Sequence, residues 1–106
     1  FSCLADKPIE EMAQVLLPLF DSASGDPARA RDHVVLAPIQ NARAATLEQL
    51  EAAAARLDVP AHAAPHVPAA LTQAQAMTPK DGIIVATGSV YLVGELRALA
   101  LGEAVA

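Results

Sequence analysis

The residues that could do chemistry all lie shortly after an apolar run of the chain, and each carries a hydroxyl group or a charge. They are Asp6, Lys7, Arg43, Ser89 and Tyr91. Lysine binds a phosphate or carboxylate as a point charge, and arginine grips it with two parallel N–H donors. A serine that opens a helix after a glycine offers its hydroxyl and unpaired backbone N–H groups to an anion. This set predicts a substrate-binding site for an anionic ligand, with no catalytic nucleophile and no metal ligand in it.

Each of these residues also has a purely structural interpretation. Ser89 can cap the helix that follows it, at a gain of about 1 kcal/mol, and Asp6 can cap the first helix. Lys7 and Arg43 can be solvated loop residues. Tyr91 can pack at the edge of a sheet with its hydroxyl in water. Both interpretations stay open on the sequence alone.

The histidines and the single cysteine indicate neither a metal site nor a nucleophile. His62 and His66 are four residues apart, but the prolines at positions 60, 65 and 68 are incompatible with a helix that would place both on one face. Cys3 lies in an apolar run, so we expect it in the core, where a thiol is inert. Glu95 is expected to be structural and to pair with Arg97 or with a neighbouring loop.

Apolar runs and helical patterns alternate along the chain and must position these residues. The runs typical of strands are Phe1–Ala5, His33–Ala37, Val59–Ala63 and Ile83–Ala86. Pro60 limits the third run to a short or edge strand, whereas the fourth is expected to be central and buried on both faces. Helices are predicted over Ile9–Phe20, from a capping box at Thr46 to Leu57, over Val67–Met77, and from Ser89 to a C-cap at Gly102.

This order of elements predicts an α/β fold. Strands and helices that alternate at this spacing form a parallel sheet with right-handed crossovers and helices on both faces. The loops that follow the strands then gather at one edge of the sheet, where ligands bind. Those loops hold Asp6-Lys7, Asn41–Arg43, His66 and Ser89–Tyr91, so we expect the candidate residues to share this edge.

The composition limits the class of protein. The 106 residues make one domain with an aliphatic core, since 54% are hydrophobic and only 3% aromatic. A net charge of −5 and a pI near 4.9 argue against binding to nucleic acid or to an anionic membrane. No apolar run approaches the roughly 18 residues of a membrane-spanning helix, and no signal peptide is seen. With a single cysteine as well, we expect a cytoplasmic protein.

Three segments together resemble a known family. The run Gly88-Ser89-Val90-Tyr91-Leu92-Val93-Gly94-Glu95-Leu96-Arg97 is similar to the G-S-x-Y-L-V-G-E-x-R signature of folylpolyglutamate synthases, often also dihydrofolate synthases, in the C-terminal domain that they share with the Mur ligase superfamily. Asp6-Lys7-Pro8 is similar to the D-K-D segment of that family, with Pro8 in place of its second aspartate. Ala37-Pro38 with Asn41-Ala42-Arg43-Ala44-Ala45 is similar to its strand and N-x-R-A loop.

The resemblance implies a Rossmann-like domain of the Mur ligase C-terminal type, here a fragment without its first strand and helix. The whole enzyme would be an ATP-dependent ligase that forms an acyl phosphate on a folate or dihydropteroate carboxylate, which the amine of glutamate then attacks. ATP and Mg²⁺ would be bound by an upstream domain, because this chain contains no phosphate loop of the G-x-x-x-x-G-K-[ST] type. This domain would orient glutamate, with Ser89 at an anionic group and with Lys7 and Arg43 as positive charges, and would be inactive alone.

Two other interpretations remain. A stand-alone small α/β domain could hold an anion at its edge loops, or regulate, without catalysis. A cell-wall peptide ligase of the same superfamily would share the fold, but the Y-L-V-G-E run favours the folate enzymes. If residues before Phe1 belong to the domain, the exposed sheet surface at Phe1–Ala5 should lower its stability or favour association without them.

Overall fold

Two short parallel strands lie at the centre of the fold. In the computed structural model, which describes residues 1–102, β1 (Val35–Leu36) pairs with β2 (His62–Ala63), with Val35 opposite His62 and Leu36 opposite Ala63. The helices are α1 (Ile9–Leu16), α2 (Leu47–Arg56), α3 (Val67–Met77) and α4 (Val90–Leu101), and two 3-10 turns follow α1, η1 (Leu17–Phe20) and η2 (Pro27–Arg29). The chain is thus a compact α/β domain with four helices and a small parallel sheet.

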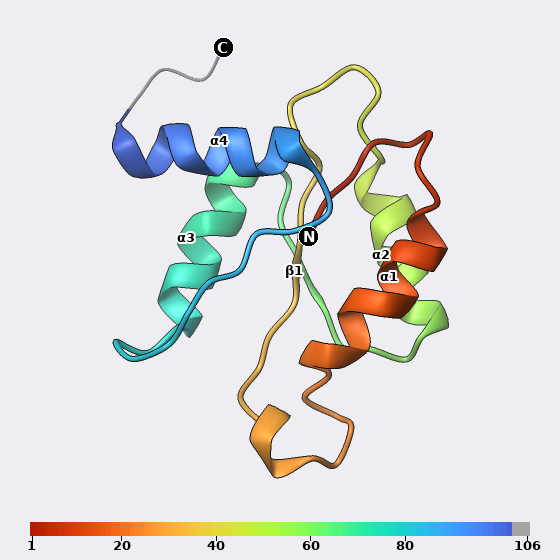
Figure 1. Cartoon of the computed structure of the whole chain (residues 1–106), viewed down its shortest axis with the longest axis vertical. Coiled ribbons are helices and arrows are strands. Elements are labelled where there is room, and N and C mark those ends of the chain that lie inside the picture. The colour runs from red at the N-terminus through yellow and green to blue at the C-terminus, as the bar shows by residue number, and fades with distance from the viewer. Residues whose placement is uncertain (103–106) are drawn as a thin grey trace.

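Helices lie on both sides of β1 (Figure 1). On one side α1 and α2 pack together, and their buried side chains meet Leu36 of β1. On the other side α3 contacts β1. α4 crosses the top of the view in Figure 1. Its Leu92 packs on Leu4, Ile39 and Val67, which lie at or just beyond the ends of the strand-like segments. The last helix therefore covers an edge of the sheet and does not lie along one of its faces.

The predicted strand at Phe1–Ala5 does not form. The Phe1 amino group donates to the carbonyl of Val35 (2.8 Å) and the Ala37 N–H to the carbonyl of Phe1 (3.4 Å), so the first residue lies beside β1 as a parallel strand would. Leu4, however, makes an antiparallel bridge to Ala44. The segment turns away from β1 after two residues, which is too short for a regular ladder.

The predicted central strand at Ile83–Ala86 does not form either. Ile83 is 84% exposed and Val85 is 59% exposed, and among the described residues the backbone of positions 83–86 makes no hydrogen bond to another backbone group. Only the next residue, Thr87, accepts a hydrogen bond, from the Ser2 N–H at 3.5 Å. A strand needs a partner of matching length, and residues 1–2 supply a single contact.

Capping residues set the ends of the helices. The Thr46 hydroxyl accepts from the Gln49 N–H (3.1 Å) while the Gln49 side chain accepts from the Thr46 N–H (2.9 Å), which is the predicted capping box. Gly102 ends α4 in the left-handed conformation, with φ at 69°. Asp6, a candidate cap of the first helix, does not cap it: the N-cap of α1 is Pro8, which has no side-chain hydrogen bond.

Within residues 1–102, no helix is both long enough and apolar enough to cross a membrane.

Candidate functional site

The loops that follow the strand-like segments meet at one edge of the molecule. Residues 1–5, β1 and residues 83–87 all run toward the top of Figure 1, and α4 begins there. Backbone contacts join the loops: Leu4 bridges to Ala44, the Ala5 N–H donates to the carbonyl of Arg43 (2.7 Å), and Ser2 contacts Thr87. Segments that are far apart in the sequence, and that carry all five candidate residues, therefore lie side by side.

Asp6 and Arg43 are in direct contact at this edge. The Arg43 guanidinium donates to an Asp6 carboxylate oxygen at 3.4 Å, and the two side chains are 61% and 56% exposed. The Asn41 side chain accepts from the Arg43 N–H (2.8 Å) and fixes the turn that presents the arginine. Asp6 thus balances part of the positive charge, while water still reaches both groups.

Ser89 caps α4 through a tightly built turn. Its hydroxyl oxygen accepts from the Tyr91 N–H at 3.0 Å, so the structural interpretation of this serine is realised. Gly88 before it has φ at +107°, and a Cβ atom there would collide with the carbonyl oxygen of Ser2 and approach the Phe1 ring to 2.7 Å. The first residues of the chain therefore hold this turn in place. Since the Ser89 oxygen only accepts in this hydrogen bond, the hydroxyl proton remains available for donation to an anion.

Lys7 and Tyr91 are brought to the same edge without a side-chain contact to the other candidates. The Lys7 side chain makes no hydrogen bond or ion pair within residues 1–102, and its backbone N–H donates to the carbonyl of Leu4 (3.2 Å) as the chain turns. Tyr91 is 45% exposed, and Val90 and Val93 in the same part of α4 are exposed as well. The structure thus brings Asp6 together with Arg43 and Ser89 together with Tyr91, and leaves Lys7 solvated.

Glu95 ties α4 to the loop that follows β1, as the expected structural role requires. Its carboxylate accepts from the Gln40 N–H at 3.1 Å, beside a pocket of about 350 Å³ whose walls include Pro38, Pro65 and His66. His66 is the N-cap of α3, and its Nδ1 accepts from the Ala69 N–H at 3.1 Å. This cap was missed in the sequence, although His66 stands directly before Val67-Pro68, a typical helix start.

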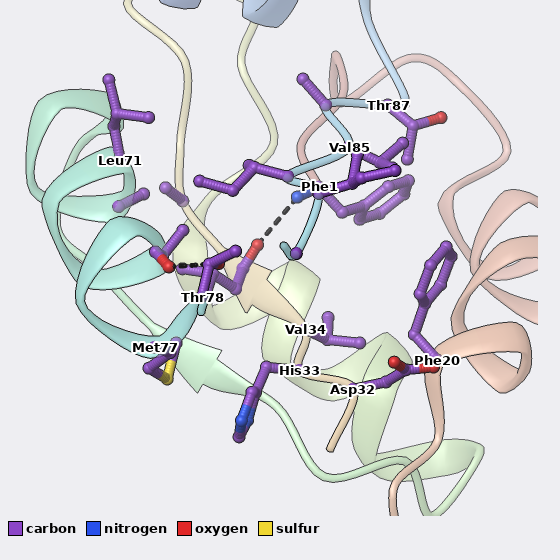
Figure 2. Close-up of a pocket in the computed structure, with 18 of the residues that line it drawn as sticks. Phe1, Phe20, Asp32, His33, Val34, Leu71, Met77, Thr78, Val85 and Thr87 are labelled. Carbon is purple, nitrogen blue, oxygen red and sulfur yellow. Dashed lines mark hydrogen bonds between the residues drawn. The ribbon is translucent and has the colours of Figure 1, made fainter. Parts of the chain in front are cut away.

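A larger cavity, of about 740 Å³, is lined by none of the five candidate residues. Figure 2 shows it between Leu71 and Met77 of α3, Phe1, and Val85 of the segment that was expected to be a strand. Polar groups stand around it, among them Asp32, His33 and Thr78, whose hydroxyl donates to the carbonyl of Ala74 (2.6 Å). The cavity exists because residues 83–86 pass α3 and β1 without pairing.

Burial shifts the pKa values of two groups at the start of the chain. Burial lowers the pKa of the Phe1 amino group from 8.0 to about 6, and the nearby Cys3 opposes this shift. Burial raises the pKa of the Cys3 thiol, which the amino group opposes in turn. Cys3 is fully buried in the core, as expected. Ser2 is fully buried as well, and its hydroxyl has no hydrogen-bond partner among the described residues.

The described part of the chain holds no group of three or more histidine, cysteine, aspartate or glutamate side chains placed to hold a metal ion. Comparison of the chain with protein-family models, with curated proteins and with solved structures gives no match.

Proposed function

We propose that this chain is the amino-acid-binding domain of an ATP-dependent acid–amino-acid ligase of the folylpolyglutamate synthase type. One observation carries the proposal: the three segments that resemble that family meet at one edge of the molecule. The Leu4–Ala44 bridge joins the segment around Asp6 to the segment around Arg43, and the contact between Ser2 and Thr87 joins the first of these to the turn before Ser89. Loops that follow parallel strands meet at one edge in any α/β fold, and here the loops that meet are the ones that carry the three resembling segments.

In this proposal the edge orients glutamate and does not itself catalyse. The N-terminus of α4 and the Ser89 hydroxyl face a carboxylate of the substrate, since unpaired N–H groups and a helix dipole favour an anion there. Arg43 and Lys7 add positive charge, and the contact with Asp6 sets the direction of the guanidinium. The domain would accelerate the reaction by positioning: it holds the amine of glutamate near the carbon of the acyl phosphate and keeps water out.

The finer fold assignment also belongs to this proposal. The contacts of Phe1 with β1 and of Ser2 with Thr87 put four segments in the order 83–87, 1–2, β1, β2, all running the same way. We take this as a Rossmann-like sheet of the Mur ligase C-terminal type that lacks a strand and a helix. ATP and Mg²⁺ are assigned to an upstream domain, so the chain alone would have no ligase activity, and the enzyme would act in the cytoplasm.

A second candidate function is anion binding by a stand-alone domain without catalysis. It rests on the same α4 N-terminus and Arg43 and needs neither ATP nor a second domain. The exposed Asp6–Arg43 pair favours it, because that pair can open toward a phosphate without any other part of an enzyme.

The test compares variants that separate capping from anion binding. In the full-length protein we expect glutamate-dependent ADP release from Mg-ATP with a folate or dihydropteroate acceptor. Ser89→Asp keeps a good N-cap but repels an anion, so it should raise the KM for glutamate at least about tenfold and leave kcat nearly unchanged. Lys7→Ala should act in the same direction, and Lys80→Ala, at the only other lysine, should have no effect.

Two results would decide between the candidates. No ADP release with any folate or dihydropteroate acceptor would refute the ligase. If, in addition, inorganic phosphate shifts the amide NMR signals of the 106-residue chain near Ser89, and Ser89→Asp abolishes those shifts, the stand-alone binding domain is the better description.

A further inference from the structure

Two histidines from different parts of the chain face each other beside β1 and β2. Nε2 of His62 lies 3.4 Å from Nδ1 of His33, and the two rings have centroids 5.4 Å apart and planes inclined by 55°. His33 stands just before β1, and His62 is the first residue of β2. The His62 N–H donates to the carbonyl of Val34 at 2.8 Å, so the sheet itself fixes the separation of the two backbones.

The distance between the two nitrogens is the one that a shared metal ion requires. Zinc binds imidazole nitrogens at about 2.0–2.1 Å in a tetrahedral arrangement, which puts two such nitrogens about 3.3 Å apart. A direct hydrogen bond between neutral rings has a shorter usual length, about 2.9–3.0 Å for nitrogen donors. In the structure the two nitrogens share a long hydrogen bond, whose donor depends on the tautomer of each ring, and an ion bound between them would replace that proton.

The surroundings favour a divalent cation. The chain has a net charge of −5, and Asp32, a half-buried residue, directly precedes His33 and offsets the charge of the neighbouring Arg31. Both histidine side chains are exposed, so water can complete the coordination. Figure 2 shows His33 at the rim of the large cavity, and neither histidine belongs to the edge that carries Asp6, Arg43 and Ser89.

We propose that His33 and His62 form a two-histidine site for a divalent transition metal such as Zn²⁺, Ni²⁺ or Cu²⁺, which links β1 to β2. The ligands are Nδ1 of His33 and Nε2 of His62, and water fills the other positions. Imidazole ligands suit these metals, whereas Mg²⁺ and Ca²⁺ prefer oxygen. The metal acts as a clamp on a sheet of only two residues per strand.

Calorimetric titration of the 106-residue chain with zinc and nickel chloride tests the site. We expect one ion per chain, no binding of Mg²⁺, and a rise in melting temperature of roughly 10 °C at a metal concentration about 100 times the Kd. His33→Ala and His62→Ala should each weaken binding at least about tenfold. His66→Asn keeps the cap of α3 and removes the third histidine, so its affinity should equal that of the unmodified chain.

The ligating atoms give a second, independent readout. In spectra that correlate the imidazole nitrogens with their ring protons, Zn²⁺ should shift Nδ1 of His33 and Nε2 of His62 and leave both nitrogens of His66 in place. The proposal is overturned if zinc does not bind, if its affinity survives both alanine substitutions, or if the shifts fall on other nitrogens.

Discussion

Replacing Gly88 by alanine should destabilise the domain more than any other glycine-to-alanine change in the described residues. Gly88 has φ at +107°, where an L-residue is strained, and its missing Cβ is where the Ser2 carbonyl oxygen and the Phe1 ring lie. The side chain of alanine must therefore push the first two residues away. This movement would break the hydrogen bond from Ser2 to Thr87 and open the start of α4.

The magnitude follows from two contributions. An unfavourable φ at one residue costs about 1–3 kcal/mol. Loss of the Ser2–Thr87 hydrogen bond adds about 0.5–1.5 kcal/mol, although its 3.5 Å length puts it at the weak end. We expect Gly88→Ala to lower the free energy of unfolding by about 2–4 kcal/mol, which is a large part of the roughly 5–15 kcal/mol of a typical domain.

Two other glycines separate these contributions in a urea titration followed by circular dichroism. Gly25 has φ at +87° but open space around its Cβ position, so Gly25→Ala should show the backbone cost alone. Gly94 lies inside α4 with open space, so Gly94→Ala should stabilise by about 0.5–1 kcal/mol. If Gly88→Ala costs no more than Gly25→Ala, the contact with Ser2 and Phe1 does not exist as described.

Three further outcomes are expected. Burial lowers the pKa of the Phe1 amino group from 8.0 to about 6, so between pH 6 and 8 the unfolded 106-residue chain binds a proton there that the folded chain does not. The free energy of unfolding should therefore rise by up to about 2.7 kcal/mol as the pH increases over that range. If this pH dependence persists after N-terminal acetylation, the explanation is contradicted. Thr46→Ala removes the capping box and should lower the free energy of unfolding by about 1 kcal/mol, measured from the urea midpoint. The control is Thr72→Ala, in the exposed middle of α3. An equal loss of stability in the two variants would argue against the role of the capping box. A double-mutant cycle with Asp6→Asn and Arg43→Gln should give a coupling below about 1 kcal/mol that falls with salt, whereas a coupling that salt leaves unchanged would mean that the pair is not exposed.

The features that the sequence predicted well depend on neighbours a few residues apart. The capping box needs only Thr46 and Gln49, and the end of α4 needs only a glycine at position 102. Pro60 predicted a short third strand, and β2 has two residues. Propensity and capping act locally, so a local pattern is enough to locate these elements.

The features that the sequence did not predict depend on contacts between distant segments. The composition of Ile83–Ala86 is that of a buried strand, but a strand forms only where another segment offers a matching ladder. Asp6 is a candidate cap on the sequence alone, yet α1 begins only at Ile9 with Pro8 as its N-cap, and the Asp6 carboxylate meets Arg43, which lies far along the chain. The spacing of His33 and His62 in the sequence does not indicate that they are close, because only the register of β1 with β2 brings them together. The sequence predicted that the loops with Asp6, Arg43 and Ser89 share one edge, but not the contact between Asp6 and Arg43.

The contact of Ser2 with the turn at Gly88 joins the first residues of the chain to the last helix, and this has a consequence for the order of folding. α1 and α2 pack on β1 through residues of the first half of the chain, so that half can collapse early. α4 can pack on its sequence neighbour α3 without a long closure. The contact of Gly88 with Ser2 and Phe1, in contrast, closes a loop over most of the sequence, and the entropy of that closure opposes it. We therefore expect the turn at Gly88 to join the first residues of the chain late in folding.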